Sequence, residues 1–342
     1  MTTLELASGI KPAHAQGPGI DLSVVVPMYN EQEDVRRHIE RLIGAIEGLG
    51  RSWELIAVND GSTDQTMARL QECQKLYPRL QVVSYKKNRG RGYALRKGFE
   101  IARGERIVST EADLSCGTAI IGQMLQVLDD EGVEIAIASP HAPGGGMEGV
   151  PVDRVFWSRY GNRILRCALG GRTFMASGMT RAYRRQVLEM LDLESEGKEI
   201  HLEILSKAYA LGFRSCDVPV TLRWDPSRRR SRAKRQTFKL VQFVLSHLLF
   251  SFSEFPFLLT GTIALVLFSL GLGAGAYAFW LSSHGIPVGS RPLTIGAVMC
   301  ILAGIQLMMF SFMSHQLRDV KQQMIRLQSR LLTLNRRFMN AE

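Results

Sequence analysis

Two acidic residues separated by a single position carry the strongest chemical signal in this sequence. Glu111, Ala112 and Asp113 follow a short apolar run that ends at Thr110. Alternate side chains of an extended segment share a face, so both carboxylates can point into one crevice. Two such acids repel each other unless a cation joins them, and hard divalent ions take oxygen ligands together with phosphate. The pattern favours Mg²⁺ or Mn²⁺ held against a diphosphate; a solvated acidic turn is the alternative that the pattern alone leaves open.

Two further polar segments follow apolar runs nearer the N-terminus, and their letters are PMYNE and NDGSTD. In the first, Tyr29 can stack on a nucleotide base that Glu31 holds. In the second, Asp60 can reach a base or a ribose, and Gly61 permits a close approach of backbone. The alternative for both segments is helix capping by their Asn, Ser and Asp side chains. Capping and ligand binding are compatible, so both interpretations are kept.

The elements that must position these residues alternate between short apolar runs and helical patterns. The predicted strands cover residues 22–27, 54–58, 80–85, 106–110 and 134–139, and the predicted helices cover residues 31–49, 63–77, 93–102 and 118–131. This alternation with short links predicts an α/β domain built on a mostly parallel sheet. Such sheets bind ligands at the carboxyl ends of their strands, which is where Asp60, Glu111 and Asp113 stand.

The composition of the 342 residues excludes a disordered or collagen-like chain, since 46% are hydrophobic and 22% charged. The formal charge of +10 is unevenly placed. Residues 1–227 carry 28 Lys and Arg against 29 Asp and Glu, whereas residues 228–342 carry 14 against 3. The basic surplus of the last third indicates a polyanionic partner, either a membrane face or a nucleic acid. The five cysteines are scattered, which favours neither a disulfide framework nor a thiolate zinc site.

Two uncharged stretches, residues 255–281 and 292–314, contain 27 and 23 residues. Each exceeds the roughly 20 residues that a helix needs to cross a bilayer, so we expect two transmembrane helices; a pair of buried core helices is the alternative. Basic residues flank both stretches, whereas the loop between them has one Arg. The positive-inside rule therefore places both flanks in the cytoplasm and predicts an inner-membrane protein. Residues 1–20 lack the apolar core of a signal peptide and are expected to be flexible.

The regions around the two stretches have patterns of their own. Residues 228–254 are basic and then apolar, which predicts an interfacial helix on anionic lipid; nucleic acid is disfavoured because no aromatic residues interleave the basic run. Within the tail, residues 315–342, apolar side chains recur at heptad spacing. They are Leu317, Val320, Met324, Leu327, Leu331, Leu334 and Phe338. This spacing is typical of a short coiled coil that joins subunits into a homo-oligomer, or of an amphipathic helix on the membrane.

Four segments together resemble a known family. They read VVVPMYNEQEDV, AVNDGSTDQT, NRGRGYALRKGFEIARGERIVSTEADLS and EIHLEILSKAYALGFRSCDVPVTLR. They are similar to the inverting glycosyltransferases of family two, above all to the polyprenyl-phosphate enzymes of the dolichol-phosphate-mannose-synthase-like branch. The resemblance covers about residues 22–239. It implies a Rossmann-like GT-A domain over residues 21–227, a UDP- or GDP-linked sugar donor, Mg²⁺ or Mn²⁺, and a polyprenyl-phosphate acceptor.

The resemblance also implies roles on the donor side. The residues implied to hold the nucleotide are Pro27, Tyr29, Glu31, Asp60 and Gly61. The residues implied to lie at the metal and the diphosphate are Glu111, Ala112, Asp113 and Ser115. The sequence departs from the family's usual pattern at Glu111, where Asp is usual, and at Ser115, where Gln is usual. A third departure is Ser139-Pro140-His141 in place of Ser-Arg-Tyr, which removes a cation expected near the diphosphate.

On the acceptor side, the resemblance implies that Glu199, His201 and Glu203 lie near the acceptor and that Arg228 and Lys234 meet its phosphate. A phosphate monoester is largely dianionic at pH 7, because its second pKa is about 6, and needs no strong general base to attack the sugar. Positioning and charge stabilisation are then the protein's task. The expected catalytic residues are Asp113, Glu203, Arg228 and Lys234. Transfer to another glycan or lipid acceptor, and a catalytically impaired membrane scaffold, are the alternatives.

Overall fold

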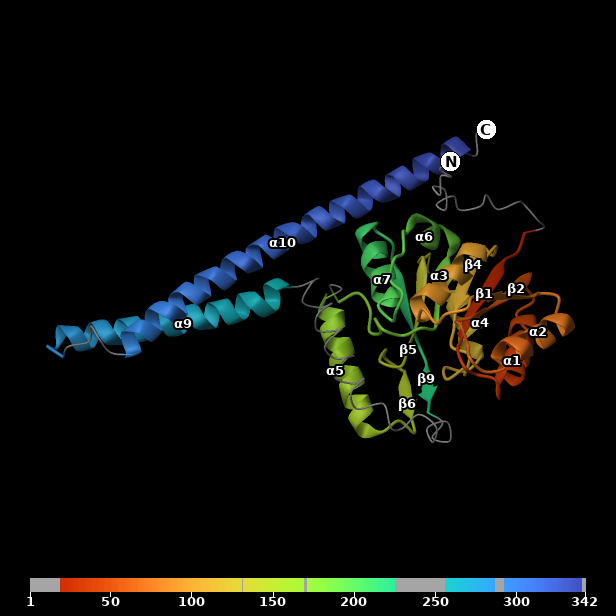
Figure 1. The fold of residues 1–342 in the computed structure, drawn as a ribbon, viewed down its shortest axis with the longest axis horizontal. Coiled ribbons are helices and arrows are strands. Elements are labelled where there is room, and N and C mark those ends of the chain that lie inside the picture. Colours follow the sequence, from red (N-terminus) through yellow and green to blue (C-terminus); the bar gives the residue numbers. More distant parts are fainter. Residues whose placement is uncertain (1–18, 131, 169–170, 225–255, 287–291, 340–342) are drawn as a thin grey trace, which may run out of the picture. The chain divides into compact units, whose positions relative to one another are not determined.

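The computed structural model describes residues 19–130, 132–168, 171–224, 256–286 and 292–339. Its centre is a seven-stranded sheet with the strand order β3-β2-β1-β4-β7-β5-β8 (Figure 1). The strands are β1 (Leu22–Met28), β2 (Trp53–Asn59), β3 (Leu80–Ser84), β4 (Arg106–Ser109), β5 (Ile135–Ser139), β7 (Arg181–Arg184) and β8 (Ser215–Pro219). Only β7 runs antiparallel to its neighbours in this sheet, so the expected mostly parallel sheet is confirmed.

The two central strands β1 and β2 are buried along almost their whole length, which explains why the sequence shows continuous apolar runs there. Two polar residues interrupt the runs at paired positions, and they satisfy each other. The Ser23 hydroxyl donates to Glu54 Oε1 at 2.6 Å, and the Glu54 carboxylate also accepts the backbone N–H of Arg103 and the amide of Gln81. Buried polar groups with partners of this kind cost little.

Helices cover both faces of the sheet (Figure 1). On one face, α1 (Val35–Glu47) and α4 (Ala119–Asp130) form the main hydrophobic core with alternate residues of β1 and β2, while α2 (Thr66–Leu76) packs on β3 and α1. On the other face, α3 (Arg91–Ile101) packs on β1 and β2. Phe99 of α3 meets Tyr183 of β7 edge to face, and Arg181 of β7 donates to the His201 carbonyl on α7 (Ile200–Ala210).

The remaining elements of the α/β domain follow β5. They are β6 (Gly146–Glu148), α5 (Val152–Ala168), α6 (Arg185–Met190) and β9 (Thr221–Arg223). Strands β6 and β9 pair in parallel as a small second sheet. The sequence predicted the first five strands and four helices within a few residues, whereas β7 and β8 were not among the predicted strands.

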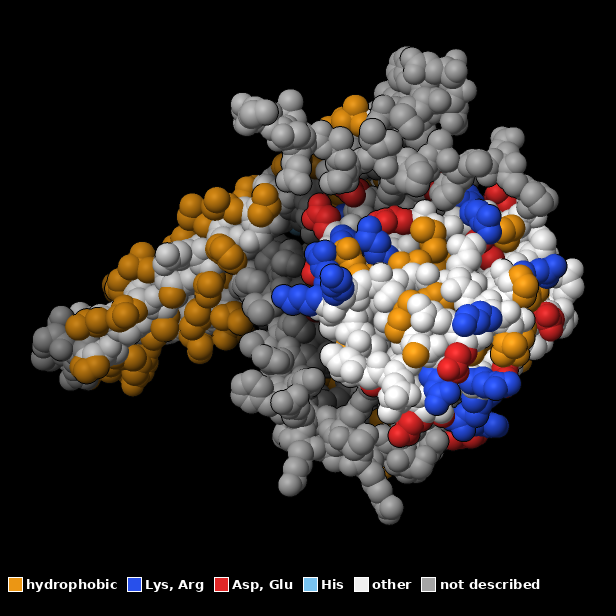
Figure 2. Space-filling view, turned by 45° about the vertical axis from the view of Figure 1, so that its right-hand side comes forward, with side chains coloured by type: hydrophobic (Ala, Val, Ile, Leu, Met, Phe, Trp, Pro, Cys, Tyr) orange, Lys and Arg blue, Asp and Glu red, His pale blue; other side chains and the backbone are white. Residues whose placement is uncertain are grey.

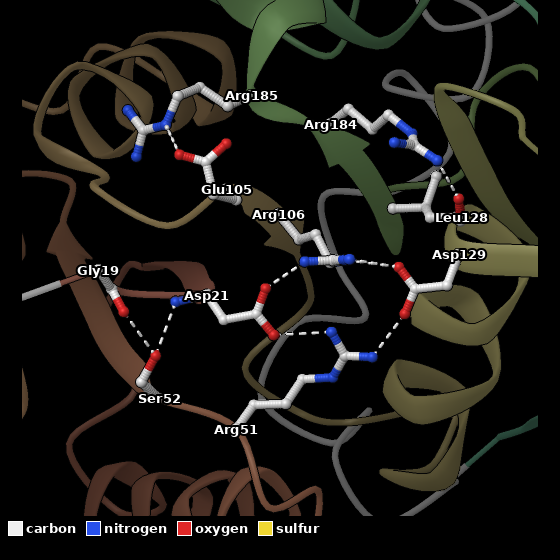
Figure 3. A network of polar contacts seen from close by, with 10 residues as sticks. All are labelled: Gly19, Asp21, Arg51, Ser52, Glu105, Arg106, Leu128, Asp129, Arg184 and Arg185. Carbon is white, nitrogen blue, oxygen red and sulfur yellow. Dashed lines mark hydrogen bonds and ion pairs between the residues drawn. The ribbon is translucent and has the colours of Figure 1, made fainter.

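The amino ends of β1, β2 and β4 are joined by a ring of four charged side chains (Figure 3). Arg51 donates to Asp21 Oδ2 at 2.7 Å and also to Asp129 Oδ2. Arg106 closes the ring, because its Nε donates to Asp129 Oδ1 at 2.7 Å and its Nη1 to Asp21. Each side chain is about one quarter exposed. The four charges cancel, and the ring ties the starts of three strands to the end of α4.

Two long helices follow the α/β domain: α9 (Pro256–Ser283) and α10 (Pro292–Met339). Within them, Thr260–Ser283 and Pro292–Leu317 are long and apolar enough to cross a membrane. Only 17% and 11% of these windows are buried, so they are not core helices of the domain, and many hydrophobic side chains line the face seen in Figure 2. The helices pack closely at glycines, since a Cβ on Gly304 would lie 2.9 Å from the backbone nitrogen of Phe268.

The tail prediction concerns the second half of α10, which runs without a break from the apolar span into the heptad region. Its seam residues are exposed wherever the structure describes their side chains: Leu317, Val320, Met324, Leu327 and Leu331. The coiled-coil and membrane-surface interpretations both stay predictions. The predicted interfacial helix, residues 228–254, and nearly all of the flexible N-terminus fall outside the described residues, and the division into domains stays a prediction.

Candidate active site

The loops that follow β1 and β2 are fastened to each other by side chains. The backbone N–H of Asn30 donates to Ser62 Oγ at 3.0 Å, and that of Thr63 donates back to Asn30 Oδ1 at 2.9 Å. The N–H of Glu31 donates to Thr66 Oγ1 at 2.8 Å. Helix α1 begins at Val35, four residues later than the sequence predicted, although the N–H of Val35 donates to the Glu31 carbonyl at 3.1 Å. Both interpretations of these loop polar groups hold: Asn30 and Ser62 bridge the two loops, whereas Asp64 Oδ1 accepts the N–H of Thr66, the first residue of α2, at 2.9 Å.

The residues predicted to hold the base lie on this fastened pair of loops. Pro27 is at the end of β1, paired with Val58 of β2, and is partly exposed. Tyr29 is 40% exposed, so its ring is accessible for stacking. Glu31, two positions later in the sequence, is partly buried. The structure therefore brings all three to the carboxyl end of β1, and their contact with a nucleotide stays a prediction.

Asp60 is buried, and its carboxylate binds the chain's own loop after β3. It accepts hydrogen bonds from the hydroxyl of Tyr85 at 2.8 Å, from the amide of Asn88 at 2.9 Å, and from the backbone N–H groups of Arg89 and Gly90 at 2.9 and 3.1 Å. Burial, together with the bond to Asp60, raises the pKa of Tyr85. Asp60 thus builds the loop that leads into α3. The predicted contact of Asp60 with a nucleoside stays a prediction.

Gly61 is required by the same loop. Its φ is +60°, and a Cβ there would lie 2.4 Å from the backbone nitrogen of Asn88 and 2.4 Å from the carbonyl carbon of Lys87. The sequence predicted that Gly61 permits a close approach of backbone, and the structure identifies the approaching backbone as the chain's own.

The two acids after β4 converge, by a geometry that the sequence did not predict. The segment turns instead of staying extended: Leu114 has a φ of +53°, and its N–H donates to the Glu111 carbonyl at 3.2 Å. As a result both carboxylates reach Ser115. Its hydroxyl donates to Glu111 Oε2 at 3.0 Å, and its backbone N–H donates to Asp113 Oδ1 at 3.1 Å. Both acids are partly exposed, and Ala112 between them is buried.

The donor atoms at this turn fit a hard divalent cation. Glu111, Asp113 and Ser115 supply oxygen alone, and the described residues contain no cluster of three or more His, Cys, Asp or Glu side chains suited to a metal. A site with two carboxylates leaves coordination positions for phosphate oxygens and water, as Mg²⁺ and Mn²⁺ sites that bind nucleotides do. The donor types are thus those of an oxygen-ligated divalent ion, and a metal at these residues stays a prediction.

One cation that the sequence analysis did not single out stands beside these acids. Arg91 is the first residue of α3, and its Nη1 lies 3.6 Å from Glu111 Oε1. The two side chains are 34% and 33% exposed, so the pair lies at the domain surface. The signal that could have revealed it is the sequence Gly90-Arg91-Gly92, in which an arginine stands between two glycines at the start of a helix.

Glu203 anchors the loop before α7. Its carboxylate accepts the backbone N–H groups of Glu194 and Ser195, both at 2.9 Å, and the ammonium of Lys207 at 2.7 Å. Burial alone would raise the pKa of Glu203, but Lys207 and the two N–H donors hold it below its ordinary value. The anchored loop packs on α3, because the N–H of Gly92 donates to the Glu196 carbonyl at 2.7 Å. A catalytic role of Glu203 stays a prediction.

The positions of the other residues predicted on the acceptor side do not test their roles. His201 is fully buried, while Glu199 stands at the N-cap of α7. Arg228 and Lys234 lie outside the described residues, so their contact with an acceptor phosphate stays a prediction.

Comparison with known proteins agrees with the family resemblance. The profile of the family described as Glycosyl transferase family 2 matches residues 23–191. A dolichol-phosphate mannosyltransferase of Pyrococcus furiosus is 31% identical over 188 residues, which cover 54% of this chain and 52% of that protein. The chain thus spans about half the length of that relative. A polyprenol monophosphomannose synthase of Mycolicibacterium smegmatis is 30% identical over 224 residues, which cover 64% of this chain and 82% of the relative.

Among solved structures, glucosyl-3-phosphoglycerate synthase from Mycobacterium tuberculosis, in complex with Mn²⁺ and UDP-glucose, aligns with a TM-score of 0.49 and 22% identity over 67% of this chain and 79% of that chain. The family profile covers most of the α/β domain, and the chain aligns with most of the M. smegmatis relative. The chain therefore belongs to glycosyltransferase family 2.

Proposed function

We propose that this chain transfers a sugar from a UDP- or GDP-linked donor to polyprenyl phosphate, giving a polyprenyl-phosphate-linked monosaccharide. The observation that carries the proposal is the convergence of Glu111 and Asp113 on Ser115 at the carboxyl end of β4. The names of the two relatives, a dolichol-phosphate mannosyltransferase and a polyprenol monophosphomannose synthase, support the lipid acceptor and make mannose the first donor sugar to test.

The chemistry proposed for the site is a single displacement with inversion at the sugar carbon. Glu111, Asp113 and Ser115 would hold Mg²⁺ or Mn²⁺, which would act as a Lewis acid for the leaving diphosphate. Tyr29 and Glu31 hold the base, and the rigid bridges between their loop and the loop after β2 keep them in place. The acceptor phosphate carries its own negative charge, so the chain's work is to orient it, a task we assign to Arg228 and Lys234.

A membrane location supports a lipid acceptor. The two apolar windows in α9 and α10 are proposed to span the inner membrane, with the α/β domain and both termini in the cytoplasm. Helix α5 also presents an apolar stripe, in which Val152, Phe156 and Tyr160 are 85%, 61% and 54% exposed. Arg159 and Arg163 are exposed on the same side of that helix. An apolar stripe edged by arginines suits contact with anionic lipid.

The direct test is sugar transfer into the lipid phase. Full-length protein in detergent is incubated with radiolabelled GDP-mannose and then with UDP-linked sugars, with Mg²⁺ or Mn²⁺ and polyprenyl phosphate, and label is measured in the organic extract. We expect metal-dependent label with one donor. Absence of label with every donor would contradict the proposal and favour a scaffold, and label in a water-soluble glycan would favour another acceptor.

A double variant tests the acceptor side separately. Changing Arg228 and Lys234 to Gln is expected to raise the KM for polyprenyl phosphate about 10-fold or more, because charged hydrogen bonds to a phosphate are each worth about 1.5–3 kcal/mol. The KM for the donor is expected to change less than about 2-fold. Equal losses for donor and acceptor would contradict the assignment of these two residues.

A further inference from the structure

The basic run before and within α3 contains several cations, and three of them have partners outside the acidic turn. Arg89 pairs with Glu196 and stacks on the Tyr93 ring, with 3.9 Å between its Cζ and the ring centroid. On α3, Lys97 pairs with Glu100, and Arg96 donates to the Leu193 carbonyl at 2.7 Å. Arg91 differs from these three, since its partner is Glu111. Among the cations of α3 with a stated partner, Arg91 is therefore the one that lies at the acidic turn.

The backbone of Arg91 is clamped on both sides. The preceding residues are held by Asp60, which accepts the N–H groups of Arg89 and Gly90. The following residues are held by the loop before α7, whose carbonyl at Glu196 accepts the N–H of Gly92. A Cβ at Gly92 would lie 2.5 Å from the Ser195 carbonyl oxygen, so this packing depends on glycine. A fixed backbone limits the positions that the guanidinium of Arg91 can reach.

The contact between Arg91 and Glu111 does not use up either group. At 3.6 Å it is longer than a normal N–H···O bond, and within the part of the chain that the structure describes it is the guanidinium's only ion pair. A guanidinium has five N–H donors and suits phosphate oxygens bidentately.

We propose that Arg91 binds the diphosphate of the donor, with Glu111 holding its guanidinium at the edge of the acidic turn. The inference rests on the proposed nucleotide-sugar donor and adds a residue to it. The negative diphosphate would then meet two positive groups. One is the divalent ion that the acidic turn favours, and the other is the guanidinium of Arg91.

Binding measurements on the full-length chain in detergent test this without any turnover. Calorimetry compares UDP and GDP with uridine and guanosine, with Mn²⁺ and again in EDTA. For Arg91→Gln we expect the affinity for the bound nucleoside diphosphate to fall about 10- to 100-fold, the loss typical of a charged hydrogen-bonded contact, with the nucleoside's affinity within about 2-fold. The affinity of Arg91→Lys for the nucleoside diphosphate should lie between those of the wild type and Arg91→Gln, because an ammonium binds phosphate as a point charge. The matched control is Lys97→Gln, which removes one positive charge from the same helix.

The outcomes separate this inference from the proposed function. An unchanged ratio of diphosphate to nucleoside affinity in Arg91→Gln would overturn the inference, as would an equal loss in Lys97→Gln. Thermal unfolding of each variant detects a folding defect. If Arg91→Gln does not fold, the binding measurement is made on Arg91→Lys. Wild-type protein that binds neither diphosphate overturns the inference as well. Protein that binds diphosphate through Arg91 but labels no lipid would contradict the proposed acceptor and leave the Arg91 assignment standing.

Discussion

The two edges of the central sheet use the same kinds of residue in opposite ways. At the amino edge, Asp21 and Asp129 face Arg51 and Arg106 in a closed ring, and each carboxylate oxygen has an arginine donor (Figure 3). At the carboxyl edge, Glu111 of the turn after β4 has Arg91 at 3.6 Å, and both acids of the turn bind Ser115. The first arrangement is a closed, neutral ring, whereas the second is an open turn with both acids partly exposed.

This difference indicates which edge is built for stability and which for chemistry. A neutral ring of ion pairs has no charge left to attract a ligand, and its members are placed to hold strand ends together. Two carboxylates on one partly exposed turn repel each other and gain stability when a cation arrives. The turn of Glu111 and Asp113 therefore stays the predicted binding site, and the amino edge supplies the control for it.

The largest expected effect comes from the same substitution made at both edges. Asp113→Asn removes a ligand charge and should lower transfer about 100-fold or more, as loss of one charge-stabilising group in an active site commonly does. Its unfolding temperature should stay within a few degrees, because the change relieves repulsion with Glu111. Asp129→Asn should do the reverse, lowering stability and leaving transfer within about 2-fold. Lipid labelling and thermal unfolding are measured on both proteins.

The opposite results for Asp113→Asn and Asp129→Asn would contradict the proposed difference between the two edges of the sheet. Transfer that survives in Asp113→Asn would remove the metal assignment, and transfer lost in Asp129→Asn with an intact fold would mean that the amino edge also serves the chemistry. Membrane insertion of both variants is checked by fractionation, so that lost activity is not mistaken for lost protein.

Much of the sheet could be predicted because parallel strands are buried on both faces. Such strands appear as continuous apolar runs, as β1 and β2 do, and their polar carboxyl ends then mark the ligand edge. The placement of Asp60, Glu111 and Asp113 at this edge followed from that rule. The apolar stripe of α1 was equally visible, because a helix that covers a sheet buries every third or fourth residue.

The contacts that complete the site depend on segments far apart in the sequence. The partner of Glu111 comes from α3, twenty residues earlier, and the turn that joins the acids needs a positive φ at Leu114, a residue type that rarely adopts it. The role of Glu203 as a loop anchor depends on backbone N–H groups, which leave no trace in the side-chain pattern. Antiparallel β7 escaped prediction because its short run RAYR is too polar to stand out.

Two glycines with similar backbone angles, one at each edge of the sheet, should differ in how much an alanine destabilises the protein. Gly61, at the carboxyl edge, has a φ of +60°, and a Cβ there would meet backbone at 2.4 Å; Gly50, which precedes β2 at the amino edge, has a φ of +65° and open space. Gly50→Ala should cost about 1 kcal/mol, the usual penalty for a side chain in this region. Gly61→Ala should cost about 3 kcal/mol or more, because the loop after β3 must also move.

Urea unfolding of the two alanine variants gives the measurement, and the loop makes a second prediction possible. Because Asp60 and Gly61 hold the backbone that leads to Arg91, Gly61→Ala should also weaken nucleoside diphosphate binding, whereas Gly50→Ala should not. Equal destabilisation by the two substitutions would show that the contact with Asn88 is not tight in solution.

The smallest expected effect concerns the ring and its dependence on pH. Burial alone would raise the pKa of Asp129, but hydrogen bonds from Arg51 and Arg106 hold it below its ordinary value. A lowered native pKa contributes stability that is present above the ordinary pKa of the group and is lost as the pH falls through the native one. Arg51→Gln should therefore cost about 1 kcal/mol at pH 7, with the difference from wild type shrinking below about pH 4.

Arg37→Gln is the matched control for Arg51→Gln, because Arg37 pairs with Asp34 on the surface and is 59% exposed. It should change the free energy of unfolding by no measurable amount at any pH. Urea titrations at pH 7 and at pH 3 to 4 make the comparison. A loss in Arg51→Gln that is as large at pH 3 as at pH 7 would mean that Arg51 stabilises the edge through the packing of its side chain, and the ring would then owe its effect to shape instead of charge.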